Sequence, residues 1–154
     1  MHVTGIIGAT ANNSEGIAGT ASGTSNNIVD IIPIRVFSED GAYDSDIVTA
    51  IEYAVKKNVK VINLSLGGED DDSVLDDAID SAYSSGVTVV CAAGNIDDEI
   101  GNAVEYPAAS DHTISVAACD SSGSRTYYST YNDYVDVMLR FPTLSLQRQD
   151  SIHL

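Results

Sequence analysis

An asparagine at the end of an apolar run is the residue of this sequence best placed to do chemistry. Residues 89–93 are apolar and small, and Gly94 and Asn95 follow them directly. A continuous apolar run is typical of a strand buried on both faces, and the ligands of a parallel sheet bind beyond the carboxyl ends of its strands. The side-chain NH2 of Asn95 is an uncharged donor, which could stabilise the oxyanion formed when a nucleophile attacks a carbonyl. An ordinary strand that ends in a Gly-Asn turn is the alternative.

A second apolar run lies upstream and ends in a similar way. Residues 59–64 carry Asn63 near their end, and residues 65–68 (SLGG), most of them small, follow. Small side chains allow an extended ligand to approach the backbone closely. If the two runs are neighbouring parallel strands, Asn63 and Asn95 lie at or near adjacent strand ends.

The elements that must position these residues alternate along the chain. Apolar residues recur at helical spacing over 47–57 and again from Ser73 until Gly86. Residues 30–37 predict a further strand, in which Pro33 marks an irregular or lightly paired portion. The order strand, helix, strand, helix, strand predicts right-handed crossovers and a parallel sheet covered by helices, which is an α/β fold.

Several segments of the chain resemble the subtilisin-like serine proteases. Residues 61–68 (VINLSLGG) resemble the family segment whose backbone pairs with the substrate, and residues 92–95 (AAGN) resemble the oxyanion-hole segment. Residues 106–108 (YPA) match the wall of the family's specificity pocket, where the proline is often cis. The strands that follow in the family are matched by residues 113–117 and 134–138.

The resemblance implies a three-layer α/β fold, with helices on both faces of a parallel sheet that is incomplete at both ends of the chain. Residues 1–138 are identified as a partial subtilisin-like peptidase domain. Asn95 takes the role of the oxyanion-hole donor. The implied substrate-binding residues are Ser65, Leu66, Gly67, Ala92, Ala93, Gly94, Tyr106 and Pro107.

Residues 10–19 resemble the calcium loop that follows the family's histidine helix, so the resemblance implies a structural calcium ion. The implied ligands are the backbone carbonyls of Ala11, Glu15 and Ile17 and the amide oxygen of Asn13. Further family ligands come from segments ahead of this chain, which makes the site partial. A Gly/Asn-rich connection without a metal is the alternative.

The same comparison of motifs places the catalytic triad outside this chain. Residues 2–5 (HVTG) match the second half of the family's His-Gly-Thr-His-Val-Ala-Gly motif, so His2 is the structural histidine of that motif. The catalytic histidine and aspartate belong upstream of Met1, and the serine belongs beyond Met138. No signal segment precedes the domain pattern in this chain, although family members are made with one, and the parent protein is expected to be secreted.

The end of the chain departs from the family pattern. After Met138 the family continues Ala-Pro-Gly, whereas this sequence reads LRFPT. Loss of one base after the Met138 codon is compatible with a protease-like continuation in the shifted frame. We interpret residues 139–154 as an out-of-frame or disordered tail, with a genuine divergent C-terminus as the alternative.

Composition limits the partners. The chain holds 23 acidic against 7 basic residues, a formal net charge of −16, which argues against nucleic acid and anionic membranes as partners. No apolar run approaches the roughly 20 residues that span a bilayer. The acidic run at 69–72 is interpreted as a solvated loop, or else as a feature that favours basic side chains in a bound peptide. Cys91 and Cys119 are expected to be buried thiols without a bridge, with a disulfide as the alternative.

Two functions follow. The first is a fragment of a serine endopeptidase that hydrolyses peptide or protein substrates and is inactive without the flanking segments of its domain. The second is a non-catalytic remnant that binds extended peptides by strand addition or has no function.

Overall fold

The computed structural model describes residues 2–22, 29–96 and 102–140. The chain divides into two compact units, Met1–Val59 and Lys60–Leu154. Within the described residues, no helix has the length and apolar character needed to cross a membrane.

The first unit contains two helices and a short hairpin. Its elements are α1 (His2–Gly8), β1 (Phe37–Ser38), β2 (Gly41–Ala42) and α2 (Asp44–Lys56). β1 and β2 pair antiparallel. After α1 the chain makes a loop and returns, because the backbone N–H groups of Gly19 and Ala21 donate to the carbonyls of Ala9 and Ile7, both at 2.8 Å.

The helix predicted around residues 47–57 is confirmed as α2. Its apolar stripe places Ile47, Ile51 and Ala54 in buried positions. Asp44 lies in the first turn and Lys56 in the last, which complements the helix dipole at both ends. The amphipathic spacing was therefore sufficient to locate this helix.

The strand predicted at residues 30–37 is wrong for most of its length. Residues 29–36 have no regular secondary structure, and β1 begins only at Phe37. Pro33 has no N–H to give to a ladder, and Ile32 and Ile34 are exposed. Apolar character alone does not make a strand, because a strand also needs a neighbour to pair with, and no described strand pairs with this segment.

The second unit is built on a four-stranded parallel sheet in the order β3-β4-β5-β6. The strands are β3 (Val61–Leu64), β4 (Thr88–Ala92), β5 (Thr113–Cys119) and β6 (Val137–Arg140). Leu64, the last residue of β3, is in register with Cys91 of β4. β4 ends one residue later, at Ala92, which is in register with Val116 of β5. The carboxyl ends of β3 and β4 therefore lie side by side at one edge of the sheet. The predicted adjacency of these two strands is confirmed.

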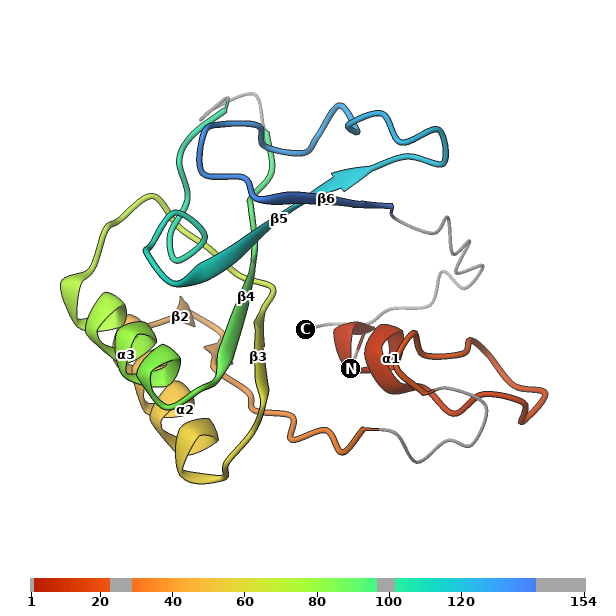
Figure 1. Ribbon diagram of the computed structural model, residues 1–154, viewed down its shortest axis with the longest axis horizontal. Coiled ribbons are helices and arrows are strands. Elements are labelled where there is room, and N and C mark those ends of the chain that lie inside the picture. Colours follow the sequence, from red (N-terminus) through yellow and green to blue (C-terminus); the bar gives the residue numbers. More distant parts are fainter. Residues whose placement is uncertain (1, 23–28, 97–101, 141–154) are drawn as a thin grey trace. The chain divides into compact units, whose positions relative to one another are not determined.

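The helix α3 (Ser73–Ser84) connects β3 to β4 and lies against β4 (Figure 1). The side chain of Asp72 caps its N-terminus by accepting a hydrogen bond from the backbone N–H of Val74 at 2.7 Å. Its buried face consists of Leu75, Ala78, Ile79 and Ala82. This confirms the helix predicted between Ser73 and Gly86.

Burial in the sheet alternates along the strands. Ile62 and Leu64 of β3 are buried, as are Val89 and Cys91, their partners in β4. Val61, on the opposite face of β3, is 58% exposed. The expectation that these strands are buried on both faces is therefore wrong for β3. Cys91 and Cys119 are buried free thiols, as predicted.

β6 crosses the boundary predicted between residues 138 and 139. Leu139 and Arg140 continue the strand and are in register with Ala118 and Cys119 of β5. Residues 141–154 lie outside the described residues. The out-of-frame origin of residues 139–154 stays a prediction.

Candidate functional site

Asn95 lies just beyond the end of β4, where backbone hydrogen bonds to two other segments hold the residues directly before it. The backbone N–H of Ala93 donates to the carbonyl of Val116 at 2.9 Å, and that of Thr130 donates to the carbonyl of Gly94 at 3.2 Å. Asn95 itself forms an antiparallel bridge with Ser129. Gly94 adopts a φ of +104°, which favours glycine. Asn95 is nevertheless exposed, so a fixed backbone presents it at the surface.

The segment that follows β3 reaches toward the predicted pocket wall. Gly68 and Tyr106 exchange two backbone hydrogen bonds of 2.9 and 2.7 Å, which form an antiparallel bridge. Ser65 and Gly67, just before this bridge, are exposed, and Leu66 is half-buried. The structure thus brings Gly68 and Tyr106 together, and the exposed residues Ser65 and Gly67 lie just ahead of this bridge.

Asn63 has a different role from Asn95. Its side-chain NH2 donates to the hydroxyl of Ser65 at 2.9 Å. It lies within β3, in register with Val90, rather than beyond the strand end. Of the two asparagines, only Asn95 lies beyond the end of its strand.

The predicted pocket wall is anchored by a buried proline. The Tyr106–Pro107 peptide bond is cis, as the resemblance implied, and Pro107 is fully buried. Desolvation raises the pKa of the Tyr106 hydroxyl, and the negative charge of Asp71 raises it further. The acidic run at 69–72 therefore lies beside this wall.

Glu105 is the residue of this site that the sequence analysis did not identify. One carboxylate oxygen, Oε1, accepts a hydrogen bond from the backbone N–H of Asn95 at 3.1 Å. A Cβ atom added to Gly94 would collide with the same carboxylate, and one added to Gly67 would come within 2.8 Å of Oε2. In the sequence, Glu105 could have been found from its position directly before residues 106–108, which resemble the family's pocket wall.

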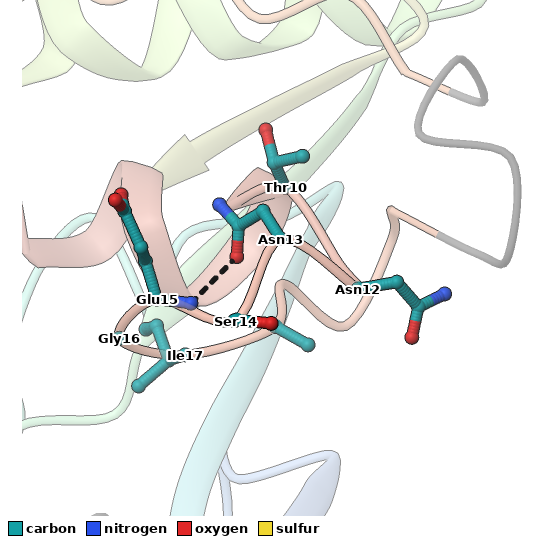
Figure 2. A pocket seen from close by; sticks show the side chains of 8 residues that line it. Thr10, Asn12, Asn13, Ser14, Glu15, Gly16 and Ile17 are labelled. Atoms are coloured by element: carbon teal, nitrogen blue, oxygen red, sulfur yellow. Dashed lines mark hydrogen bonds between the residues drawn. The ribbon is translucent and has the colours of Figure 1, made fainter.

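The predicted calcium loop forms a small hollow in the first unit. The hollow has a volume of about 210 Å³ and is lined by Thr10 and residues 12–18. Asn12 and Ser14 have left-handed φ values of 60° and 62°. Figure 2 shows the amide oxygen of Asn13 turned toward the backbone nitrogen of Glu15, which donates to it at 3.1 Å.

The oxygen atoms of this loop are of the type that calcium prefers, but none of the implied ligands is negatively charged. An amide oxygen that accepts one hydrogen bond keeps a second lone pair for a cation, and the implied carbonyls of Ala11, Glu15 and Ile17 are hard, neutral ligands. Among the described residues, no group of three or more acidic, histidine or cysteine side chains is arranged to hold a metal. The loop alone offers a neutral and partial coordination sphere.

Comparison with known proteins identifies the family. The family model described as "Subtilase family" matches residues 1–145. The chain belongs to the subtilase family. Thermitase of Thermoactinomyces vulgaris is 39% identical over 137 residues, which cover 88% of this chain and 46% of thermitase. Subtilisin DY of Bacillus licheniformis is 38% identical over 139 residues, which cover 89% of this chain and 48% of that protein.

Solved subtilase structures share the fold. A protease of Pseudoalteromonas arctica PAMC 21717 superimposes with a TM-score of 0.78 at 34% identity, covering 90% of this chain and 42% of that one. A psychrophilic subtilisin-like protease of Pseudoalteromonas sp. AS-11 gives a TM-score of 0.77 at 36% identity, covering 90% and 30%. These similarities confirm the subtilisin-like α/β fold. The chain spans about half the length of the curated relatives it matches.

Proposed function

We propose that residues 1–154 form the part of a subtilisin-like serine endopeptidase that holds an extended peptide and supplies one oxyanion donor. The observation that supports this most is the register of β3 and β4, because the exposed residues Ser65, Gly67 and Asn95 all follow the ends of these two neighbouring strands. Peptide or protein substrates are the substrate class of such a protease.

In this proposal the chain binds and polarises but does not attack. A peptide lies extended along Ser65, Leu66 and Gly67, and the segment of Ala92, Ala93 and Gly94 flanks it. The side chain of Asn95 donates to the carbonyl oxygen as negative charge develops on it. The serine that attacks, the histidine that takes its proton and the aspartate that orients the histidine belong to segments of the family domain that residues 1–154 do not match.

A probe that reacts with activated serines separates this proposal from a complete protease. We expect residues 1–154, incubated with a fluorophosphonate probe and a fluorogenic peptide, to show neither covalent labelling nor cleavage. Thermitase run in parallel is the positive control. Labelling of any serine in residues 1–154 would overturn the inactive interpretation.

The second candidate function is a non-catalytic module that binds extended peptides. The exposed segment beside the Gly68–Tyr106 bridge supports it, because an exposed extended backbone can accept an added strand. Insertion of residues 2–138 in place of the matching segment of thermitase distinguishes the two. A chimera that cleaves peptides favours the protease, and one that folds and binds peptides without cleaving them favours the module.

Calcium binding and secretion belong to the same proposal. Loop residues 10–17 would bind Ca²⁺ weakly through neutral oxygens, and Ca²⁺ that binds only the folded state raises the melting temperature. We expect millimolar Ca²⁺ to raise the melting temperature, and Asn13→Ala to diminish this rise. If Ca²⁺ leaves the melting temperature unchanged, the site is contradicted.

Secretion of the parent is supported by a relative called an extracellular protease, from Xanthomonas campestris, which is 37% identical over 147 residues.

A further inference from the structure

The carboxylate of Glu105 lies between the two segments that flank the proposed peptide site. Oε1 accepts from the backbone N–H of Asn95, the residue that carries the oxyanion donor. Oε2 lies 2.8 Å from the place where a Cβ atom of Gly67 would be, and Gly94 borders the carboxylate from the other segment. Both glycines thus leave room for this one acidic group, which is half-buried.

Within residues 2–22, 29–96 and 102–140, no ion pair joins Glu105 to a cationic side chain. The ion pairs among the described residues join Lys56 to Glu52 and His112 to Asp80, and neither involves Glu105. Desolvation and the negative charge of another acid, Asp71, raise the pKa of the neighbouring Tyr106 hydroxyl. One backbone N–H satisfies only part of the hydrogen-bonding capacity of a carboxylate, which has about four acceptor positions.

We propose that Glu105 makes this site select a cationic side chain, lysine or arginine, at the peptide residue whose carbonyl faces Asn95. This inference rests on the proposed function. An ammonium or guanidinium group would form a charge-assisted hydrogen bond with the remaining carboxylate lone pairs. An uncharged side chain would instead displace water from the carboxylate without forming a hydrogen bond in its place, which costs free energy.

The test compares peptides that differ at one residue. N-acetylated, fluorescein-labelled extended peptides carry arginine, lysine, norleucine or glutamate at that position, and their affinity for residues 1–154 is measured by fluorescence anisotropy. Norleucine keeps the alkyl chain of lysine and removes its charge. Because hydrogen bonds to charged groups are worth about 1.5–3 kcal/mol, we expect arginine and lysine to bind about 10- to 100-fold more tightly than norleucine. Glutamate should bind most weakly.

Two variants assign the selectivity to Glu105. Glu105→Gln keeps an acceptor oxygen for the Asn95 N–H and removes the charge, so it should equalise the arginine and norleucine peptides by weakening arginine binding and strengthening norleucine binding. Glu69→Gln removes one charge from the exposed acidic run and is the matched control, which should keep the preference. Added salt should weaken the binding of the cationic peptides only.

The outcomes separate this inference from the proposed function. Equal affinity for all four peptides would overturn the charge selection and leave peptide binding intact. An equal loss of preference in Glu69→Gln and Glu105→Gln would also overturn it, because the preference would then come from the overall negative charge. If no peptide binds, the proposed function fails, and this inference fails with it.

Discussion

The backbone N–H of Asn95 donates a 3.1 Å hydrogen bond to the carboxylate of Glu105. This contact joins the segment after β4 to the residue that precedes the predicted pocket wall. It fixes the backbone of the proposed oxyanion donor, whose residue remains exposed. A donor held before the substrate arrives pays no reorganisation cost when charge develops, which is the physical basis of oxyanion stabilisation.

Replacement of Asn95 should lower catalysis more than binding. In the thermitase chimera carrying residues 2–138, we expect Asn95→Ala to lower kcat by about 10²–10³, the magnitude already known for removal of such a donor in subtilisin, with little change in KM. Asn63→Ala is the matched control, because the Asn63 side chain already donates to Ser65. Equal losses of kcat in both variants, measured by steady-state peptide hydrolysis, would contradict the assignment.

Gly94→Ala should destabilise the chain more than a comparable glycine substitution. Gly94 has a φ of +104°, and its added Cβ would collide with the Glu105 carboxylate. Gly123 has a φ of +83° with open space around it, so Gly123→Ala reports backbone strain alone, about 1–3 kcal/mol. Urea unfolding should show a larger loss for Gly94→Ala, and Glu105→Ala should recover part of the difference. The same loss for both glycines would contradict the close approach of Glu105.

The cap of α3 should contribute measurably to stability. Asp72 accepts a 2.7 Å hydrogen bond from the backbone N–H of Val74. We expect Asp72→Ala to lower the free energy of unfolding by about 0.5–2 kcal/mol, the usual value of an N-cap. Asp70→Ala, in the same acidic run, should change it little. A neutral Asp72→Ala would show that the cap is not formed in solution.

Asp120 should make stability depend on acidic pH. Its carboxylate accepts hydrogen bonds from the hydroxyl and N–H of Ser122 and the N–H of Ser124, which hold its pKa below the usual 3.8. The unfolded state therefore binds the proton more readily, and stability is lost as the pH falls below about 4 through the folded pKa. Asp120→Asn should flatten this part of the unfolding profile, and an unchanged profile would contradict the contact.

The buried thiol of Cys91 should resist alkylation. Desolvation raises its pKa to about 12, so the reactive thiolate is scarce at pH 8. Iodoacetamide should label Cys91 slowly in the native chain and quickly in urea, as followed by mass spectrometry of its peptide. Rapid native labelling would show that β4 is not buried as described.

The helices and the central strands could be predicted from the sequence because their patterns are local. Apolar spacing located α2 and α3, and the runs before Ser65 and Gly94 located β3 and β4. The segment around Pro33 failed because strand formation depends on a partner, which local composition does not report. β5 and the segment that leads into β6 were identified through the family resemblance. The apolar pattern of each segment, taken alone, is short.

The site was predictable only in part. Asn95 and Gly67 belong to motifs, so their types and spacing led to their prediction as site residues. Glu105 is a single acidic residue on a loop, and its importance comes from its approach to Gly67 and Gly94, which lie on two other segments. Sequence separation conceals such a contact, and only the folded chain brings the three residues together.

The most direct test of the central claim is an amide NMR titration of residues 1–154 with a lysine-containing extended peptide. The account predicts chemical-shift changes concentrated at Ser65, Gly67, Gly94 and Asn95, with the amides of α2 unchanged. Absence of any change at these four residues, or changes confined to α2 and α3, would contradict a peptide site at the ends of β3 and β4.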